Sequence, residues 1–493
     1  MNATILAAVR EAGVPTSPAI VTDSGSWTFQ ELCDAAERLA GELAERHDTA
    51  RPLAVRLADP VAATVTVLAS DAAGIPLIHC DPATAASFAA ATVGDRRTTR
   101  GASSGLGAQP VPLRSGVPGM TLLPPPVDGS GIPAAPPRST QTFLTSGSTG
   151  RPVGVVRTAA AILADARRVA AFLAYGADAP VVVAAPLFHA YGFNYGLVGP
   201  MLAGAPVRHC PARSVPSQLA RVVRAVQART LIALPFHYGL LADALGQSAA
   251  HAGGTRAEPA SALAGLVRAV SAGGPLPPGA PGRIARQAAF QLYNCYGSSE
   301  AGAVTLNMVT GAEADGEIGT PLPGVSLRTT EPVDPTLPGE LLLRSESLAV
   351  GRLGPDGGLV PLPTRDGWYA TGDLARPSTG GGVRLAGRLD AVINVGGRTV
   401  SLVDIEHVLR AHPGVADAHV QAEDDGLRGQ VPAARVVLRS AAELGQVLRW
   451  CRDRLEPHQM PRRIEAVTVL PRSATGKVLA GHGGPAPAME VSR

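Results

Sequence analysis

Residues 145–154 read Thr145-Ser146-Gly147-Ser148-Thr149-Gly150-Arg151-Pro152-Val153-Gly154, and they directly follow a short apolar segment at 142–144. The three glycines allow a ligand to approach the backbone closely, and the hydroxyl side chains with successive N–H groups can surround phosphate oxygens. No Gly-Lys-Ser or Gly-Lys-Thr stands at the spacing that a Walker A loop requires. A stretch rich in Ser, Gly and Thr is also typical of plain surface turns, so a phosphate site needs support from the rest of the chain.

Strand and helix signals alternate on the N-terminal side of this loop. Thr28 and Glu31 form a capping box, and apolar residues at helical spacing predict a helix that begins there. A short apolar run at 53–55, a helical stretch at 61–73 and a buried strand at 74–78 come next. This alternation predicts a large, layered, doubly wound α/β domain.

The rest of the chain divides into regions of different character. Residues 94–140 are rich in Gly, Pro, Ser and Arg and show no sustained period, which predicts a long, variable, loop-rich region. The pattern changes again after Gly387, and residues 391–493 predict a small α+β unit, a second domain of about a hundred residues. Further strands of the large domain are predicted by apolar runs at 180–185, 231–235, 264–272 and 289–293.

The composition argues against several classes of protein. A net charge of +3, with no basic stripe carrying interleaved aromatic residues, argues against nucleic acid as a partner. The five cysteines are scattered and form no CxxC pair, which argues against a disulfide scaffold or a zinc site. Prolines interrupt the apolar region 179–207, and Arg10 and Glu11 interrupt the N-terminus too early for a signal peptide. We therefore predict a cytoplasmic protein without a nucleic-acid or membrane partner.

The loop becomes specific when it is compared with known motifs. TSGSTGRPVGV resembles TSGSTGxPKGV, the phosphate-binding signature of the adenylate-forming superfamily, which includes acyl- and aryl-CoA synthetases, adenylation domains of peptide synthetases and luciferases. The family usually has lysine where this chain has Val153, and that lysine is thought to assist the β- and γ-phosphates. Arg151 and Arg157 are the nearby cations that we consider as replacements.

Further motifs of the same superfamily follow in the expected order. Residues 186–192, PLFHAYG, resemble its PLFHxxG segment, which implies that His189 lies near the carboxylate of the acid. Residues 271–276, SAGGPL, resemble its glycine-rich segment beside adenine, and residues 294–300, NCYGSSE, resemble YGxTE. The resemblance implies that the tyrosine of this motif stacks on adenine, that the hydroxyl contacts the AMP phosphate, and that Glu300 holds Mg²⁺, which prefers oxygen ligands.

The C-terminal motifs complete the resemblance. YATGD ends at Asp373, implied to bind both ribose hydroxyls, and GRLD contains Arg388, implied to contact ribose or phosphate. Asp390 is implied to be the hinge between a large domain at 1–389 and a small, mobile lid domain at 390–493. LPRSATGKV resembles LPRTxxGKI, whose lysine, here Lys477, bridges the acid carboxylate and the α-phosphate.

The composition of the chain supports the assignment of Lys477. Of the 43 basic residues, only Lys477 is lysine, which is consistent with the arginine, alanine and glycine bias of a GC-rich genome. The bias accounts for the arginines, yet the single lysine stands where the family has its adenylation residue.

The resulting predictions can be collected by role. The catalytic residues are Lys477, Glu300 and His189, with Glu300 as the metal ligand and Asp390 as the hinge. The predicted ATP- and AMP-binding residues are Thr145, Ser146, Gly147, Ser148, Thr149, Gly150, Gly273, Gly274, Asn294, Cys295, Tyr296, Gly297, Ser299, Asp373 and Arg388. The predicted acid pocket comprises Phe188, His189, Phe193, Phe236, His237, Tyr238, Ser271, Tyr293 and Ala301.

The resemblance implies an AMP-forming ligase that activates a small carboxylic acid with ATP and Mg²⁺ and transfers it to CoA. The aromatic and imidazole character of the pocket favours a small aryl or polar acid over a long acyl chain. The alternative is a stand-alone adenylation enzyme that passes the acid to a carrier-protein phosphopantetheine thiol or to an amine or other nitrogen nucleophile in natural-product biosynthesis. A non-catalytic nucleotide-binding homologue is a third reading, supported only by Val153.

Overall fold

The structure is a computed structural model of the 493-residue chain. It describes residues 4–81, 91–94, 111–112, 121–123, 137–146, 152–250, 262–311, 316–331, 338–354, 358–378, 381–395, 398–425, 429–439, 444–470, 472, 478 and 488–490. Contacts divide the chain into two compact units. The first unit comprises residues 1–314, 318–326 and 344–363, and the second comprises 315–317, 327–343 and 364–493.

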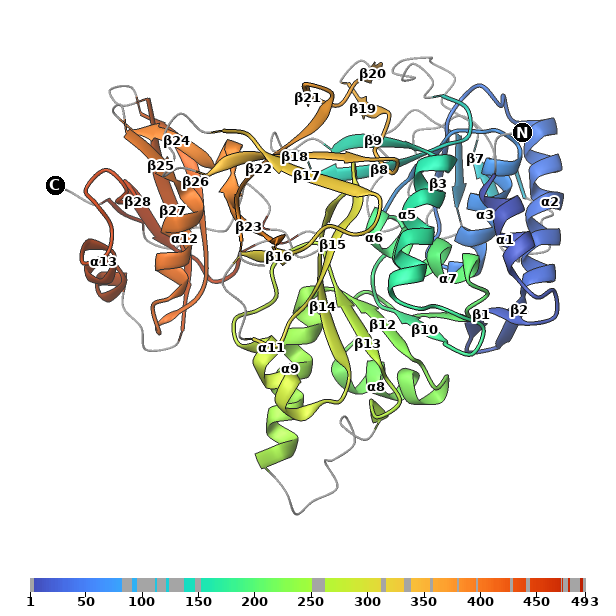
Figure 1. Cartoon of the computed structure of the whole chain (residues 1–493), viewed down its shortest axis with the longest axis horizontal. Helices are drawn as coiled ribbons and strands as arrows, with labels where there is room; N and C mark the ends of the chain where they lie inside the picture. The colour runs from blue at the N-terminus through green and yellow to red at the C-terminus, as the bar shows by residue number, and fades with distance from the viewer. Residues whose placement is uncertain are drawn as a thin grey trace. The chain divides into compact units, whose positions relative to one another are not determined.

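The N-terminal elements form as their sequence predicts. The Thr28 hydroxyl accepts a hydrogen bond from the Glu31 N–H at 3.2 Å, and the Glu31 carboxylate accepts one from the Thr28 N–H at 2.8 Å, so the capping box starts α2 (Phe29–Arg46). The predicted strand, helix and strand that follow are β3 (Leu53–Arg56), α3 (Pro60–Ala72) and β4 (Leu77–His79). The apolar face of α2 packs with α1 (Ile5–Ala12) and α3 in one hydrophobic core. Figure 1 shows these three helices side by side, in blue.

The described residues of the first unit form an eight-stranded sheet that is parallel at its centre. Its order is β15-β14-β13-β12-β10-β11-β1-β2. Helices from the same part of the chain pack against the central strands and share a core with them (Figure 1). The strands are β1 (Pro18–Thr22), β2 (Gly25–Thr28), β10 (Val181–Val183), β11 (Val207–His209), β12 (Thr230–Ala233), β13 (Arg268–Ser271), β14 (Gln291–Ser298) and β15 (Gly302–Met308), and the helices are α8 (Pro216–Ala225), α9 (Pro235–Ala250) and α11 (Ala280–Gln287).

A nine-stranded sheet completes the first unit within its described residues, in the order β20-β19-β9-β8-β4-β3-β5-β7-β6. The hairpin of β8 and β9 brackets the 145–154 loop, and β19 pairs antiparallel with β9. Most of the predicted loop-rich region 94–140 lies outside the described residues, and β6 and β7 fall within it. The remaining elements are β5 (Ala91–Gly94), β6 (Val111–Pro112), β7 (Thr121–Leu123), β8 (Thr140–Ser146), β9 (Pro152–Thr158), β19 (Gly351–Leu353), β20 (Leu359–Val360), α5 (Ala159–Phe172), α6 (Ala190–Phe193), the π-helix η1 (Asn194–Val198) and α7 (Gly199–Leu202).

The second unit contains the predicted α+β fold at the C-terminus. Its described C-terminal strands form a sheet in the order β25-β24-β27-β28-β29, with β26 paired to β27, and α12 and α13 share a core with this sheet. The strands are β24 (Val392–Val395), β25 (Arg398–Ser401), β26 (Val415–Asp425), β27 (Gly429–Leu438), β28 (Arg463–Ala466) and β29 (Ala488–Glu490), and the helices are η3 (Leu389–Ala391), α12 (Leu402–Arg410) and α13 (Leu444–Arg452).

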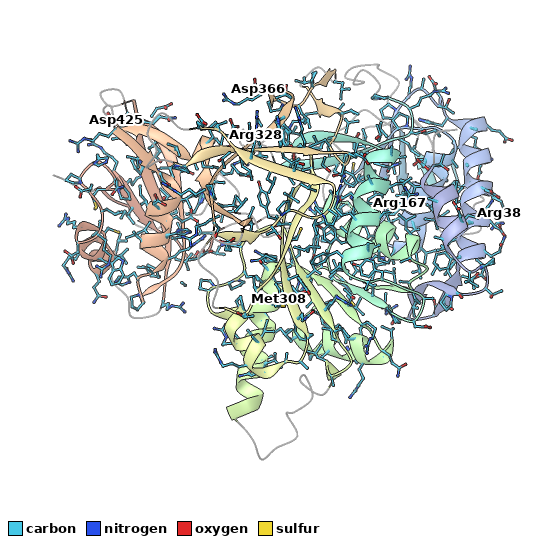
Figure 2. The ribbon with its side chains drawn as sticks, viewed as in Figure 1. Arg38, Arg167, Met308, Arg328, Asp366 and Asp425 are labelled. Atoms are coloured by element: carbon cyan, nitrogen blue, oxygen red, sulfur yellow. The ribbon has the colours of Figure 1, made fainter. Side chains whose placement is uncertain are left out.

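A second sheet precedes it, in the order β16-β23-β22-β18-β17 with β21 paired to β22. Arg328 and Asp366, labelled in Figure 2, form an exposed ion pair of 3.2 Å here, and the Arg328 guanidinium lies 4.7 Å from the centre of the Trp368 ring. By contacts, residues 364–389 group with the C-terminal residues, while the domain boundary at Asp390 stays a prediction. The strands are β16 (Glu317–Gly319), β17 (Val325–Thr329), β18 (Gly339–Ser345), β21 (Thr364–Arg365), β22 (Trp368–Pro377) and β23 (Val383–Arg388).

Candidate functional site

Two polar side chains lie together where the parallel pairing of β13 with β14 ends, at the carboxyl end of β13. Ser271 and Asn294 are register partners, and the Ser271 Oγ and Asn294 Oδ1 atoms are buried with no hydrogen-bond partner among the described residues. Gly273 follows with a φ of +91°, and no atom lies within 4 Å of the position that a Cβ would take there. Ligands of α/β sheets bind at such carboxyl ends, so these oxygens are suited to hydrogen-bond a ligand.

The turn between β14 and β15 has a backbone that only glycine permits at two positions. A Cβ on Gly297 would meet the Gly302 carbonyl oxygen at 2.2 Å, and one on Gly302, whose φ is +72°, would meet the Asp165 carboxylate at 2.2 Å. Tyr296 and Ser299, both half-buried, stand on this turn. The predicted adenine- and phosphate-contacting residues therefore lie on a backbone with a defined conformation.

Glu300 closes this turn and forms an ion pair that the sequence did not predict. Its Oε1 atom lies 2.8 Å from Nε and 2.7 Å from Nη2 of Arg352, on β19. The Glu300 carbonyl oxygen accepts a hydrogen bond of 2.7 Å from the N–H of Ala349, which precedes Arg352 by three residues. Glu300 is thus held at both its backbone and its side chain, and both guanidinium contacts go to one of its two carboxylate oxygens.

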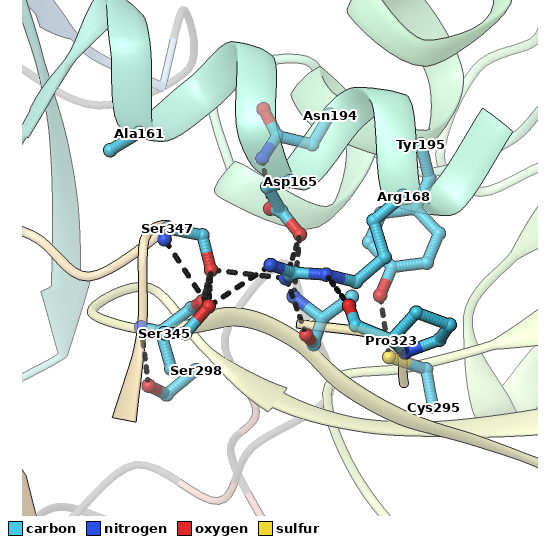
Figure 3. Close-up of polar contacts among 12 residues, drawn as sticks. Ala161, Asp165, Arg168, Asn194, Tyr195, Cys295, Ser298, Pro323, Ser345 and Ser347 are labelled. Carbon is cyan, nitrogen blue, oxygen red and sulfur yellow. Dashed lines mark hydrogen bonds and ion pairs between the residues drawn. The ribbon is translucent and has the colours of Figure 1, made fainter. Parts of the chain in front are cut away.

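A buried polar network supports the turn from the side of α5 (Figure 3). Asp165 is fully buried; its Oδ1 accepts a 2.9 Å hydrogen bond from the Ala303 N–H, and its Oδ2 lies 3.3 Å from Arg157 Nη1. Arg168 donates to the Ser347 hydroxyl at 3.1 Å, and that hydroxyl donates to the Ala301 carbonyl at 2.7 Å. The network therefore fixes Ala301 and Ala303, which closely follow Glu300 in the chain.

The same network excludes Arg157, one of the two arginines considered as replacements for the lysine that the family has at the position of Val153. Arg157 is fully buried, and its Nη2 donates to the Ser347 carbonyl at 2.9 Å as well as contacting Asp165. A guanidinium committed in this way does not reach a nucleotide. Arg151 lies outside the described residues.

The predicted phosphate loop is described only at its ends. The Thr145 hydroxyl donates to the Val153 carbonyl across the hairpin at 3.2 Å, and Ser146 pairs with Pro152 as the last register pair of β8 and β9. The residues between them, Gly147, Ser148, Thr149 and Gly150, lie outside the described residues.

The predicted acid-pocket residues take different places in the first unit. Ser271 lies at the carboxyl edge, whereas Phe193 is fully buried in a cluster with His79 and Phe143. Tyr293 faces Phe172 of α5 with a ring-centre distance of 5.5 Å. A substrate contact by these residues stays a prediction.

The other predicted pocket residues form pairs or take part in core contacts. Phe188 and His189 have ring centres 4.6 Å apart, and Phe236 and His237 have ring centres 3.9 Å apart. Tyr238 is fully buried and donates to the Val270 carbonyl at 2.8 Å. Ala301 is buried, and Gly274, predicted to bind nucleotide, is exposed beside Gly273.

Cys295, predicted among the nucleotide-binding residues, turns its thiol into the core. Its Sγ lies 2.7 Å from the Tyr195 hydroxyl, and burial raises the pKa of the thiol to about 12. The thiol is therefore protonated at neutral pH and suited to packing rather than to nucleophilic chemistry.

Buried histidines make the stability of the first unit depend on pH. Burial lowers the pKa of His79 and His237 to about 4, and that of His209 to about 3, from the usual 6.5. Between pH 6.5 and 4 the unfolded chain binds protons at these sites that the folded chain does not, so stability is complete above pH 6.5 and falls on acidification. Asp71, whose pKa burial raises to about 6, offsets part of this loss because its folded carboxyl binds the proton more tightly.

We therefore expect the free energy of unfolding to fall between pH 6.5 and 5, by roughly 1.5 kcal/mol for each histidine. The variant His79→Asn should be less stable at pH 7 but lose less stability over this interval, measured by urea titration at both pH values. An unchanged dependence on pH in His79→Asn would contradict the assignment.

The second unit contains the three predicted residues of the C-terminal motifs that the structure describes. Arg388 Nη1 lies 3.0 Å from Asp373 Oδ1, and Arg388 Nε lies 2.9 Å from Asp390 Oδ1. Burial lowers the pKa of Arg388, but the two carboxylates outweigh this and raise it above its usual value. The half-exposed Arg388 guanidinium thus links Asp373, the residue predicted to bind ribose, to Asp390, the predicted hinge. Lys477 lies outside the described residues.

No helix among the described residues is long and apolar enough to cross a membrane. All five cysteines are described, and each is free.

Two family models match this chain. The model described as AMP-binding enzyme matches residues 131–351, and the model described as AMP-binding enzyme C-terminal domain matches residues 404–477. The first match includes the 145–154 loop and Glu300, and the second ends at Lys477. Arg352 lies one residue beyond the first match.

Relatives and solved structures agree with these models. The 2-succinylbenzoate–CoA ligase of Salmonella typhimurium is 31% identical over 334 residues, which cover 66% of this chain and 64% of that protein, less than two thirds of its length. The o-succinylbenzoate CoA synthetase of Bacillus subtilis, solved with an acyl-adenylate intermediate, has a TM-score of 0.75 at 19% identity and covers 99% of both chains. The amide bond synthetase of Marinactinospora thermotolerans has a TM-score of 0.74 at 24% identity, covering 96% of this chain and 97% of that one. The predicted fold class, a large layered α/β region with a smaller C-terminal α+β region, is confirmed.

Proposed function

Because the chain belongs to the adenylate-forming superfamily of AMP-binding enzymes, we propose that it is an AMP-forming ligase that activates a small carboxylic acid with ATP and transfers it to CoA. The observation that carries this proposal is the linkage of Glu300 to the hairpin around the 145–154 loop. Arg352 holds the Glu300 carboxylate and stands on the strand paired with β9. A carboxylate and a cation are thereby linked to β9, the strand that follows the predicted phosphate loop, and such charged groups are what the handling of a polyphosphate requires.

The first half-reaction joins two anions. A carboxylate oxygen of the acid attacks the α-phosphorus of ATP, the bond to the bridging oxygen breaks, and pyrophosphate leaves with the electron pair. The site has to neutralise charge and keep the reactants in line. We assign the loop hydroxyls and N–H groups to the phosphates, and Lys477 to the contact between the acid and the α-phosphate.

The Glu300 carboxylate is a suitable ligand for Mg²⁺. Mg²⁺ is commonly held by one or two carboxylates together with substrate phosphates, and Glu300 offers a hard oxygen donor. We assign the ion to the Glu300 carboxylate, whose Oε1 atom also contacts Arg352. Bound there, Mg²⁺ would neutralise phosphate charge. The described residues contain no group of three or more His, Cys, Asp or Glu side chains placed to hold a metal ion.

The second half-reaction transfers the acyl group to the thiol of CoA, and AMP leaves. We propose that the small domain moves about Asp390 between the two steps and withdraws Lys477, as a compact ammonium on a flexible stem allows. Five free cysteines support a reducing, cytoplasmic location.

The acid that the site supports best is small and aryl or polar. The paired rings of Phe236 with His237 and of Phe188 with His189 are flat apolar groups, and the buried oxygens of Ser271 and Asn294 are hydrogen-bonding groups; we assign both kinds to the acid. The Salmonella relative is named for such an acid, 2-succinylbenzoate.

The test is ATP–pyrophosphate exchange across a panel of aryl, dicarboxylic and fatty acids. We expect exchange that depends on one class of small acid and on Mg²⁺. A chain that binds ATP but gives no exchange with any acid would instead favour the non-catalytic homologue that Val153 raised.

The second candidate differs only in the acceptor. A neighbour of the same fold is an amide bond synthetase. In this candidate function an amine or a carrier-protein thiol replaces CoA in the same second step. Supplying the activating acid with CoA, a phosphopantetheinylated carrier protein or a set of amines, and identifying the acylated product by mass spectrometry, separates these acceptors.

A further inference from the structure

We propose that Glu340 is a positioning residue for Asp373, the carboxylate predicted to bind the ribose hydroxyls of ATP. This role rests on the proposed function and on the predicted role of Asp373. The two residues lie on the neighbouring strands β18 and β22, within the second unit. Only 8% of the Glu340 side chain is exposed, and a carboxylate is rarely buried without partners that account for it.

The regular pairing of β18 with β22 is interrupted where Asp373 stands. Three residues of β22, 371–373, lie opposite one residue of β18, Leu341. Regular pairing continues beyond this bulge with Glu340 opposite Leu374. Bulges re-aim side chains and are common beside functional sites. The direction in which Asp373 presents its carboxylate therefore depends on the conformation of residues 371–373.

The Glu340 side chain contacts the centre of this bulge. Its Oε1 atom accepts a hydrogen bond of 3.3 Å from the N–H of Gly372, the residue immediately before Asp373. Gly372 has a φ of +75°, a conformation that glycine adopts at little cost. Glu340 thus supplies an acceptor to a residue whose backbone departs from the strand conformation.

The Glu340 residue is itself held in place. Its N–H donates to the Thr330 hydroxyl at 2.9 Å, and its carbonyl accepts from the Thr330 N–H at 2.9 Å. Its Oε2 atom lies 2.8 Å from Nε of Arg365. The backbone and both carboxylate oxygens therefore have defined partners, so the Gly372 N–H is bound by a fixed group.

Thr371 provides the other side of the same bulge. Its hydroxyl donates to the Leu341 carbonyl at 2.8 Å and accepts from the Asp373 N–H at 3.0 Å. The backbone before Asp373 is thereby held at two successive residues, Thr371 and Gly372. Such contacts fix the geometry of a binding group.

Asp373 also contacts Arg388, its register partner on β23, with 3.0 Å between Oδ1 and Nη1. An ionised carboxylate accepts hydrogen bonds at about four sites, so contacts inside the protein are compatible with ribose binding. A pair of neighbouring hydroxyls is bound well only by a carboxylate held in the right direction, and displacement of about 1 Å weakens such contacts strongly. The bulge held by Glu340 therefore controls recognition of the ribose.

The length of the Glu340 side chain matters more here than its charge. Arg365, its ionic partner, is 58% exposed, and ion pairs with such exposed groups contribute little. Glu340→Gln keeps the length and an acceptor oxygen for the Gly372 N–H. Glu340→Asp keeps the charge but withdraws the acceptor from Gly372. A role limited to pairing with Arg365 predicts the opposite order, with Glu340→Asp the milder change.

The experiment measures binding of MgATP and of the magnesium complex of 2′,3′-dideoxy-ATP by calorimetry, without acid. We expect the wild type to bind ATP roughly tenfold or more tightly than the dideoxy nucleotide, since hydrogen bonds to a charged acceptor are lost. Glu340→Gln should keep this preference. Glu340→Asp should reduce it to about threefold or less and leave the affinity for the dideoxy nucleotide unchanged, because only the contacts made through Asp373 weaken.

The matched control is Glu406→Asp in the same unit. Glu406 Oε2 accepts a hydrogen bond of 3.1 Å from the Val420 N–H, and its Oε1 lies 2.9 Å from Arg410 Nη2, so it resembles Glu340 in its partners. This variant should keep the wild-type preference for ATP. Circular dichroism of each variant confirms that it is folded.

The inference is overturned if Glu340→Asp keeps the full preference for ATP, if it loses affinity for both nucleotides equally, or if Glu340→Gln loses as much preference as Glu340→Asp. A wild type that binds the two nucleotides equally would overturn the ribose role of Asp373 and the inference, and would leave the proposed function standing. Failure of the proposed function is recognised separately, by a wild type that gives no ATP–pyrophosphate exchange with any acid.

Discussion

Replacing Lys477 by alanine should slow formation of the acyl-adenylate by about a hundred- to a thousandfold, as expected when one preorganised contact to developing charge is removed. Thioester formation from chemically prepared acyl-adenylate and CoA should proceed about as fast as in the wild type. The reason is that Lys477 is proposed to act only while the carboxylate attacks the α-phosphate. Pyrophosphate exchange measures the first half-reaction, and thioester release from supplied acyl-adenylate measures the second.

Chemical labelling provides an independent measurement at this residue. Lys477 is the only lysine in the sequence, so an amine-directed reagent should modify it and the N-terminal amine alone. ATP together with the acid should protect Lys477 and leave the N-terminus reactive, which serves as the internal control. This role would be refuted if Lys477→Ala slowed both half-reactions equally, or if ATP and the acid left the labelling of Lys477 unchanged.

Replacing Asp165 by alanine should destabilise the first unit by about 3–5 kcal/mol, the usual effect of removing one partner of a buried ion pair. Arg157 would keep its charge in a fully buried position, where Asp165 now lies 3.3 Å away. The Ala303 N–H and the Asn194 amide would lose their acceptor as well. Urea unfolding followed by fluorescence and by circular dichroism measures the shift.

The control for this variant is an exposed pair of similar geometry. Asp243 lies 3.1 Å from Arg283, and 63% of its side chain is exposed. Asp243→Ala should change stability by less than about 1 kcal/mol because water screens such pairs. Comparable midpoints for Asp165→Ala and Asp243→Ala would contradict the claim that the network supports the turn carrying Glu300.

Local signals in the sequence predicted much of the fold. The capping box at Thr28 and Glu31 starts α2 as expected, and the apolar runs at 231–235 and 289–293 fall on β12 and β14. These predictions succeed because helix caps and buried strands are encoded by residues close together in the chain.

The candidate site was only partly predictable, because some of its contacts join distant segments. Motifs brought Glu300 and Asn294 to notice, but the pairing of β19 with β9, which places Arg352 beside Glu300, depends on strand register. Arg157 was a candidate phosphate ligand by its place in the sequence. Its full burial against Asp165 follows from the packing of α5 on the turn, which no local pattern encodes.

The central claim, that the acid is activated as an acyl-adenylate, is tested most directly with an acid whose carboxylate carries ¹⁸O. The attacking carboxylate oxygen becomes part of the α-phosphate, so the account predicts AMP containing one ¹⁸O atom when CoA or another acceptor takes the acyl group. Mass spectrometry of the released AMP gives the result. Product formation with unlabelled AMP, or with the label in inorganic phosphate, would contradict the account.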